Sequence, residues 1–407
     1  MLSRLRIVFV AAGIYLHIPF CKSRCSYCDF ATDVYRENGA VERYVDALIK
    51  EIESFGFDEA VPERFIVSKN GDVPYVSGVS LTGTHIVADT VYFGGGTPSL
   101  LMPEQLSRVL AALETQFAID KSAEITMEMN PATVTPESLS AYRSLGVNRA
   151  SFGVQTFNDR ALKLLARGHD ANDARNTFDM LRETGFENIS FDLIGGLPGQ
   201  TMADWEANLD EAIKMSPEHI SLYLLEIHAG TPIAEQVRSG RQPVPDDQLA
   251  AEMYEVMLDR LAASGYRQYE ISNFSRTNFE SLHNSKYWRL DPVFGFGVSA
   301  HSFDGRQRYA NERDTARYVG LMETSTSAEV FREEIDCSSE FAFLGLRLED
   351  GIDLNNYTHR FGVDLSKKYE KELRDLCDAG LIETALGYLR LTRKGKLYSN
   401  EVFAVFV

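Results

Sequence analysis

The sequence has 407 residues, of which 44% are hydrophobic and 25% charged, and its formal net charge is −18 at pH 7. This composition is typical of a globular protein, and the length is too great for one ordinary core unless a barrel carries an appended domain. A chain this acidic repels a phosphate backbone, which argues against nucleic acid as a partner.

The amino-terminal segment contains an apolar run that follows Arg4 and Arg6. A signal peptide would be cleaved near Ala11-Ala12-Gly13, but the run continues into a β-rich segment that leads to a cysteine motif. No apolar run approaches the ~18 residues of a membrane span. We therefore expect a cytoplasmic protein with no transmembrane segment, in which residues 1–12 are an extension or an early strand.

Short apolar strands alternate with longer helical stretches between residues 13 and 230. Six β–α repeats of this kind predict a parallel sheet, either curled into a barrel or doubly wound. In a parallel barrel the chemistry collects at the carboxyl ends of the strands. We expect strands at 13–18, 90–95, 124–130, 149–154, 189–196 and 219–227, and helices at 39–55, 103–116, 136–145, 159–166, 172–185 and 202–215.

Three further segments depart from this pattern. An insertion over 62–88 carries Ser68-Lys69-Asn70-Gly71-Asp72 between β-prone runs, which predicts a hairpin. Residues 231–324 contain a Pro- and Gln-bearing linker, a helix over 248–264 and an α/β extension. Residues 325–407 are mainly helical and end in a strand–turn–helix pattern typical of a winged-helix-like unit. The acidity of the chain favours a packing or lid role for this unit, and we expect it to cover the barrel mouth.

Three of the five cysteines form a C-x3-C-x2-C motif at Cys21, Cys25 and Cys28. An odd, clustered set is typical of a metal site in a reducing compartment and unlike a disulfide framework. A structural zinc site would need a fourth protein ligand nearby, and the next residues are Asp29 and Phe30. Three thiolates can hold a [4Fe–4S] cluster and leave its fourth iron open to substrate. The spacing therefore favours a cluster.

Glycine and polar residues close several of the later strands. Gly94-Gly95-Gly96-Thr97-Pro98 ends the second strand, where glycines let a ligand approach the backbone N–H groups. The period-two alternation of EITMEMN points Glu128 into the barrel, where its carboxylate needs a cationic or hydrogen-bonding partner. Gln155 ends the fourth strand, Arg167 can pair with a carboxylate, and Asp192 precedes a glycine turn suited to ribose hydroxyls. A structural role is the alternative for each of them.

Together these motifs resemble the radical S-adenosylmethionine (SAM) superfamily, in which an aromatic residue precedes the last cysteine. The resemblance implies a partial (β/α)6 barrel over 13–230 and a [4Fe–4S] cluster whose open iron chelates SAM. In that family an electron from the cluster cleaves the sulfonium to methionine and a 5′-deoxyadenosyl radical. The resemblance assigns the cluster to Cys21, Cys25 and Cys28, and SAM to Tyr15, Tyr27, Gly95, Gly96, Thr97, Glu128, Gln155, Arg167 and Asp192.

The resemblance covers nearly the whole chain, and further motifs indicate which branch of the superfamily the chain resembles most. YLHIPFC, GGGTPS, GVQTF and DLIGGLPGQT are similar to the group that contains oxygen-independent coproporphyrinogen III oxidases and HemW-type heme chaperones. The oxidases typically carry one more cysteine two residues after the third, where this chain has Phe30. The chaperone branch carries HNxxYW, and this chain reads HNSKYW over 283–288, followed by the glycine loop GFGVSAHS. The chain is thus more similar to the heme chaperones.

The HNxxYW motif also has a plausible chemistry, because neutral imidazole is a common axial ligand of heme iron and aromatic rings pack on porphyrins. As an isolated pattern, a histidine beside Tyr and Trp is more often part of a core. With the resemblance, we expect His283 to be the heme ligand, with Asn284, Tyr287 and Trp288 beside it. The rival ligands are His17, His169 and His301, followed by His85 and His359.

Two functions of different classes fit this sequence. The first is a heme-binding and heme-transfer protein that keeps a cluster with SAM; Phe30 and HNxxYW favour it. The second is an enzyme, an oxygen-independent coproporphyrinogen III oxidase that decarboxylates propionates to vinyl groups. Radical methyl transfer with porphyrin ring opening is a minor third alternative, and no catalytic residue is assigned. The expected partners are heme or a porphyrin, a heme-acceptor protein, a one-electron donor such as flavodoxin or ferredoxin, and a second copy in a homodimer.

Overall fold

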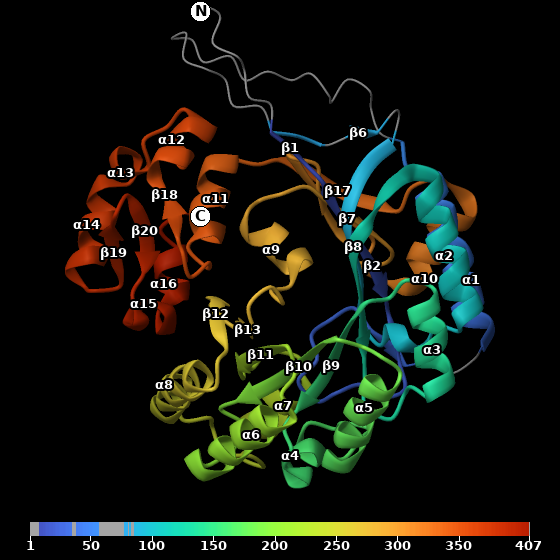
Figure 1. Cartoon of the computed structure of the whole chain (residues 1–407), viewed down its shortest axis with the longest axis horizontal. Coiled ribbons are helices and arrows are strands. Elements are labelled where there is room, and N and C mark those ends of the chain that lie inside the picture. Colours follow the sequence, from blue (N-terminus) through green and yellow to red (C-terminus); the bar gives the residue numbers. More distant parts are fainter. Residues whose placement is uncertain (1–7, 35–37, 57–76, 80, 83–84, 407) are drawn as a thin grey trace, which may run out of the picture.

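The computed structural model describes residues 8–34, 38–56, 77–79, 81–82 and 85–406. Its centre is one large twisted sheet with helices packed along it and a C-terminal unit at one side (Figure 1). Six parallel strands follow one another across this sheet in chain order, which confirms the predicted β–α repeats. They are β2 (Ala12–Ile18), β7 (His85–Gly95), β8 (Phe117–Met129), β9 (Arg149–Gln155), β10 (Asn188–Gly195) and β11 (His219–Leu224).

Every connection between these strands contains a helix, and the sequence marks where several of them start. Thr135, Asp170 and Thr201 each accept a hydrogen bond from the backbone N–H three residues later, and that later side chain returns a bond. This reciprocal capping box satisfies N–H groups that a helix start leaves without partners. The helices are α1 (Asn38–Glu53), α2 (Pro103–Gln116), α3 (Pro136–Ser144), α4 (Asp159–Leu164), α5 (Ala171–Glu183) and α6 (Met202–Met215), with a short 3₁₀ helix at Pro98–Leu100.

The parallel strands alternate between the helix layer and the interior of the curved sheet. In β2, Ile14 and Leu16 are fully buried in the main hydrophobic core, while Tyr15 and His17 face the other side. The helix layer takes up the apolar side chains of every second residue. As a result, the interior of the curved sheet receives the polar ones, which positions them for ligand chemistry.

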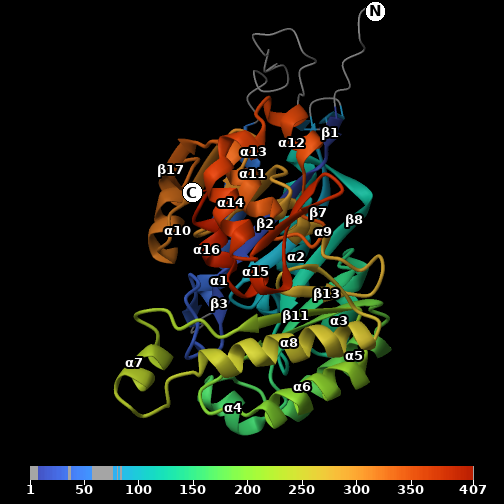
Figure 2. The same cartoon turned by 90° about the vertical axis from the view of Figure 1, so that its left-hand side faces the viewer.

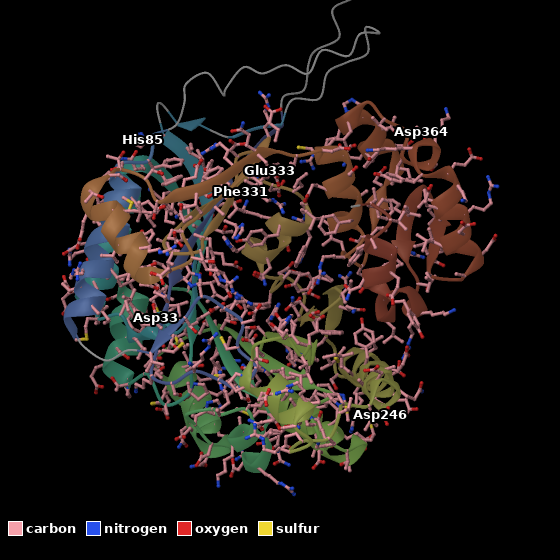
Figure 3. The ribbon with its side chains drawn as sticks, turned by 180° about the vertical axis from the view of Figure 1, so that it is seen from behind. Asp33, His85, Asp246, Phe331, Glu333 and Asp364 are labelled. Atoms are coloured by element: carbon pink, nitrogen blue, oxygen red, sulfur yellow. The ribbon has the colours of Figure 1, made fainter. Side chains whose placement is uncertain are left out.

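The extension after β11 lengthens this sheet at both ends. On the β11 side, β13 (Asn273–Ser275) and β12 (Arg267–Glu270) add antiparallel strands; on the β2 side, β14 (Val293–Phe296) is parallel and β15 to β17 antiparallel. The exposed edge strand β17 carries four charged residues, among them Glu333, beside Val330 and Phe331, and such charges discourage edge-to-edge pairing (Figure 3). The other elements here are α7 (Pro232–Arg238), α8 (Asp247–Ala263), α9 (Leu282–Trp288), β15 (His301–Phe303), β16 (Gln307–Asn311), α10 (Thr315–Thr324) and β17 (Glu329–Glu334).

The C-terminal unit has a small sheet and a hydrophobic core of its own. The unit lies at the side of the large sheet, with α8 and α9 next to it (Figure 1 and Figure 2). Arg393 pairs with Glu255 and Asp259 of α8, and Arg360 donates to the carbonyl oxygens of Arg289 (3.0 Å) and of the next residue, beside α9. These contacts lie on α8 and beside α9, which is a packing role for this unit; that it covers the barrel mouth stays a prediction. Its elements are α11 (Cys337–Gly345), β18 (Ile352–Asp353), α12 (Leu354–Phe361), α13 (Leu365–Lys368), α14 (Glu370–Asp378), β19 (Ile382–Ala385), β20 (Tyr388–Leu391), α15 (Arg393–Leu397) and α16 (Ser399–Phe403).

Five short strands complete the described fold near the chain start. β1 (Val8–Val10) pairs in parallel with β5 (Ser77–Val79), and β6 (Leu81–Thr82) forms an antiparallel pair with the start of β7. The hairpin turn predicted at 68–72 lies outside the described residues. The remaining short pair, β3 (Phe20–Cys21) and β4 (Asp33–Val34), brackets the cysteine loop. Among the described residues, no helix is both long and apolar enough to cross a membrane.

Gly395 lies in a tightly packed part of the C-terminal unit, and its substitution tests that packing. A Cβ atom at Gly395 would collide with the carbonyl oxygen of Leu381, a rigid backbone group. We expect Gly395→Ala to lower the free energy of unfolding by about 2 kcal/mol, the range typical of overpacked cores. Gly320→Ala is the matched control, because a Cβ there meets nothing within 4 Å, and alanine favours the helix by up to ~1 kcal/mol. Urea unfolding midpoints measure both effects, and equal midpoints for the two variants would contradict this account of the packing.

Candidate functional site

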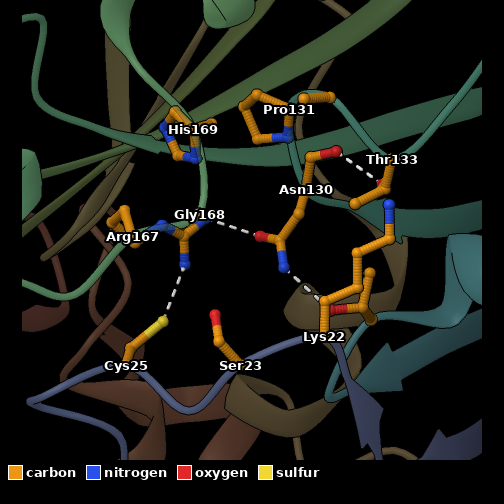
Figure 4. A pocket seen from close by; sticks show the side chains of 11 residues that line it. Lys22, Ser23, Cys25, Asn130, Pro131, Thr133, Arg167, Gly168 and His169 are labelled. Carbon is orange, nitrogen blue, oxygen red and sulfur yellow. Dashed lines mark hydrogen bonds between the residues drawn. The ribbon is translucent and has the colours of Figure 1, made fainter. Parts of the chain in front are cut away.

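The three motif cysteines lie on the loop that follows β2, and a different partner approaches each thiol. Thr97 Oγ1 lies 3.6 Å from Cys21 Sγ, and Arg167 Nη1 donates to Cys25 Sγ at 3.3 Å (Figure 4). Cys28 Sγ is 3.9 Å from the hydroxyl of Thr32. Donors of this kind stabilise a thiolate, which is the form that binds metals.

The cysteine loop does not form a site for a single metal ion. Within the described part of the chain, no three His, Cys, Asp or Glu side chains converge closely enough to share one. A cubane cluster requires no such convergence, because each thiolate binds a different iron atom. The arrangement of the thiols therefore disfavours a zinc site and remains compatible with a [4Fe–4S] cluster.

Glu128 joins the glycine turn to the barrel interior. Its two carboxylate oxygens accept hydrogen bonds from the Tyr92 hydroxyl at 2.8 Å and from the Gly95 N–H at 3.1 Å. Burial raises the pKa of this carboxyl to about 7, and these two donors oppose the shift. Gly95 has a φ of +110°, which favours glycine, and a Cβ at Gly96 would lie 2.7 Å from the Pro19 backbone. The glycines thus allow the turn to lie directly against the cysteine loop.

Arg167 and its neighbours form the other side of the mouth. Besides Cys25, the Arg167 guanidinium donates to Tyr27 Oη at 3.4 Å, Asn130 Oδ1 at 2.5 Å and the Gly153 carbonyl at 2.7 Å. Gln155 ends β9 beside it, buried and with a φ of +66°. Arg167 thus bonds at once to Cys25 and Tyr27 of the cysteine loop, to the side chain of Asn130 and to the backbone of Gly153. It therefore fixes the cysteine loop to the carboxyl end of β9.

Asp192 lies deeper in the barrel, on β10. Burial raises the pKa of its carboxyl, while a hydrogen bond from Ser221 and the positive charges of Arg149 and Arg167 oppose the shift. The structure thus brings the predicted SAM-binding residues to one end of the sheet, around the cysteine loop. Tyr15 lies below them, with its hydroxyl 3.0 Å from His17 Nδ1 and its ring stacked on Tyr92.

The sequence analysis missed Asn130 and Arg149. Asn130 donates to Thr97 Oγ1 at 2.8 Å and accepts from Arg167, so it connects the glycine turn to the cysteine loop. It also lines a pocket with Lys22, Cys25 and other residues (Figure 4). The Asn130-Pro131 dipeptide at the end of EITMEMN was the available signal, since such a pair marks a strand end. Arg149 begins a strand and carried no motif.

The HNxxYW segment forms α9, which contacts the start of β2 and the middle of β7 and β8, away from the cysteines. Glu124 of β8 accepts hydrogen bonds from the backbone N–H groups of Leu282 and His283, at 3.1 and 3.0 Å. Lys286 donates to the Ala11 carbonyl at 2.7 Å and pairs with Asp89 at 2.7 Å. The helix is thereby anchored to three strands and forms the floor of the barrel.

The His283 ring is 1% exposed and both of its nitrogens have partners. Nδ1 lies 2.9 Å from Thr90 Oγ1, and Nε2 lies 3.1 Å from the Tyr287 hydroxyl. Burial, followed by the charges of Lys286 and Arg149, lowers the pKa of His283 to about 3, so its ring is neutral at physiological pH. In this conformation an iron atom reaches Nε2 only if the Tyr287 hydroxyl moves away.

Comparison with known proteins decides the family. The Radical SAM superfamily model matches residues 83–212, and the HemN C-terminal domain model matches 334–398. The heme chaperone HemW of Bacillus subtilis (strain 168) is 34% identical over 400 residues, which span 97% of this chain and 98% of that protein. The chain belongs to the HemW family of radical SAM proteins.

A further relative and a solved structure are also similar to this chain. A mitochondrial radical S-adenosyl methionine domain-containing protein 1 from Bos taurus is 33% identical over 91% of this chain and 81% of that protein. The solved coproporphyrinogen III oxidase HemN of Escherichia coli has a TM-score of 0.80 at 24% identity, covering 98% of this chain and 90% of that one. This likeness shows a shared fold. Membership of the radical SAM superfamily implies a [4Fe–4S] cluster and SAM as cofactors.

Proposed function

We propose that this protein is a heme chaperone, which binds heme, transfers it to acceptor proteins and carries a [4Fe–4S] cluster with SAM. The observation that carries the proposal is the similarity to proteins named heme chaperone HemW over 97% of the chain. Phe30 supports it, because the ring stands where the oxidase branch typically carries another cysteine. A phenyl ring cannot ligate iron, and this one is 66% exposed beside the cysteine loop.

In this proposal Cys21, Cys25 and Cys28 hold the cluster, and the donors from Thr97 and Arg167 stabilise the sulfur charge. A cluster held there would supply one electron to the SAM sulfonium. Cleavage of SAM would then require a one-electron donor of the flavodoxin or ferredoxin kind.

The SAM site proposed here is divided between two groups of residues. Glu128 and the Gly95-Gly96-Thr97 turn receive the ammonium of SAM, because the turn brings a carboxylate and close backbone together. Tyr15, Tyr27, Gln155, Arg167 and Asp192 complete the SAM site.

For heme, we propose His283 as the axial ligand after the Tyr287 hydroxyl leaves Nε2. Two observations support this choice. The ring is neutral, and the contact with Thr90 orients it through the other nitrogen, as is common for metal-bound histidines. The half-buried rings of Tyr287 and Trp288 lie on the same helix, with Asn284, and are proposed to contact the porphyrin.

The test uses full-length protein, reconstituted anaerobically and given SAM, a reductant and either heme or coproporphyrinogen III. Heme absorbance is followed by titration, and protoporphyrinogen formation by chromatography. Stoichiometric heme binding without porphyrinogen turnover supports the chaperone. Multiple turnovers of coproporphyrinogen would contradict it and establish the oxidase.

We expect His283→Ala to weaken heme binding at least about tenfold and to leave the iron–sulfur absorbance unchanged, since one axial bond is lost far from the cysteines. His301→Ala is the matched control, because His301 is the exposed histidine beside the glycine loop. Heme titration of both variants decides the ligand. A loss confined to His301→Ala would move the assignment there.

A further inference from the structure

Arg149 is a buried arginine that forms no hydrogen bond or ion pair with the described residues. It begins β9, is 1% exposed, and lies beside Thr126 of β8 and Asn188 of β10 in the sheet register. Its Nε has no hydrogen-bond partner, and no hydrogen bond or ion pair joins its guanidinium to any residue that the structure describes. Burying an uncompensated guanidinium costs free energy. The groups that Arg149 faces should therefore explain why a charge is retained there.

Two carboxylates of the proposed SAM site face this charge. Glu128 follows Thr126 by two residues on the same face of β8, and Asp192 points inward from β10. Burial raises the pKa of Glu128 to about 7 and raises that of Asp192, and the positive charge of Arg149 opposes both shifts. Arg149 is therefore electrostatically coupled to both acids.

Arg167 does not replace Arg149 in this role. Its charge acts on Asp192, but its Nη atoms already donate hydrogen bonds to Cys25, Tyr27, Asn130 and the Gly153 carbonyl. The Arg167 guanidinium therefore serves the cysteine loop. The guanidinium of Arg149 makes no such hydrogen bonds with the described residues.

We propose that Arg149 is a positioning residue of the SAM site, the internal counter-ion that holds Glu128 and Asp192 as carboxylates inside the barrel. The inference rests on the SAM site proposed above and is independent of heme. It gives Arg149 a defined effect on SAM: Glu128 ionises as the pH rises through about 7, and the ammonium of the ligand then meets a carboxylate. Without Arg149, both acids would retain their protons to higher pH.

Four other titratable side chains face Arg149, and none of them contributes to the pH dependence expected here. Tyr92 of β7 and Tyr269 of β12 have pKa values raised by burial, and His219 of β11 and His283 of α9 have pKa values lowered by burial. None of these four side chains changes charge between about pH 5 and pH 9. Over that range the ammonium of SAM also titrates, near the ~7.7–8.0 of an α-amino group, but it does so identically for every variant. A difference in pH dependence between variants therefore reports on Glu128 and Asp192.

The test measures the dissociation constant of SAM between pH 6 and pH 9 on anaerobically reconstituted full-length protein, by equilibrium dialysis. In the natural protein we expect affinity to rise through about pH 7 and to level off above about pH 8. In Arg149→Gln we expect the midpoint to move up by at least one pH unit, which is about a fivefold loss of affinity at pH 7 and about a tenfold loss at pH 6, with convergence near pH 9. Arg149→Lys retains the charge and should restore the midpoint.

Arg347→Gln is the matched control, because Arg347 is a largely buried arginine that pairs with Glu270 away from the SAM site. It should leave the midpoint unchanged. A loss of affinity in Arg149→Gln that is equal at every pH, without rescue by lysine, would overturn the proposal. If Arg149→Gln fails to fold, an upward-shifted midpoint in Arg149→Lys would also overturn it. Absence of SAM binding in the natural protein would instead contradict the proposed SAM site.

Discussion

Cys25→Ala will remove the brown [4Fe–4S] absorbance from the reconstituted protein. Two remaining thiolates hold a cubane poorly, and the substitution also leaves Arg167 Nη1 without the sulfur acceptor that lies 3.3 Å away. We expect bound iron and sulfide to fall at least about tenfold, since even partners outside the ligand shell change metal affinity by that factor. Iron and sulfide analysis with the absorbance spectrum measures this loss.

Cys377→Ala is the control for thiol loss. Cys377 is exposed on α14, in the C-terminal unit. This variant should therefore retain the iron, sulfide and absorbance of the natural protein. A Cys25→Ala protein with full iron and sulfide content would show that Cys25 is not a ligand, and the assignment of all three cysteines would need revision.

The position of the residues around the cysteine loop could be predicted from the sequence because they belong to strand ends. In a parallel sheet the carboxyl ends of all strands lie at one edge, so Gly95, Glu128 and Gln155 had to gather once their strands were identified. Period-two alternation then gave the direction of Glu128 correctly. Those inferences depend only on local patterns.

The environment of HNxxYW could not be predicted in the same way. His283 is buried by partners far away in the chain, Thr90 on β7 and the Glu124 carboxylate that binds its backbone. Nothing within α9 indicates which strands it contacts. Arg149 was missed for a similar reason, since its significance lies in the absence of a partner, and a sequence records no absences of that kind.

The C-terminal unit illustrates a different limit. Its strand and helix pattern was readable, yet its position was not, because position depends on charged pairs such as Arg393 with Asp259 of α8. An exposed Arg and Asp in a sequence have many possible partners. Composition suggested a packing or lid role, and the observed contacts on α8 and around α9 are of the packing kind.

Glu128→Gln will weaken SAM binding by roughly 10- to 100-fold at pH 8, because a charge-assisted hydrogen bond to the ammonium is worth about 1.5–3 kcal/mol. The pH dependence will also change. Because burial raises the pKa of Glu128 to about 7, the anion forms as the pH rises through 7, and SAM affinity of the natural protein should rise with it. Glutamine cannot ionise, so the variant should lose that dependence. Isothermal titration at pH 6 and pH 8 measures both effects.

Glu124→Gln is the control that distinguishes a role of Glu128 in SAM binding from a general requirement for buried carboxyl groups on β8. Glu124 lies on the same strand and face four residues earlier, but its carboxylate caps α9 at the floor of the barrel. Its loss should destabilise α9 and leave the pH dependence of SAM binding intact. If Glu124→Gln abolished that dependence while Glu128→Gln preserved it, the ammonium contact would have been assigned to the wrong carboxylate. A flat profile in Glu128→Gln alone would identify Glu128 as the titrating group at the mouth.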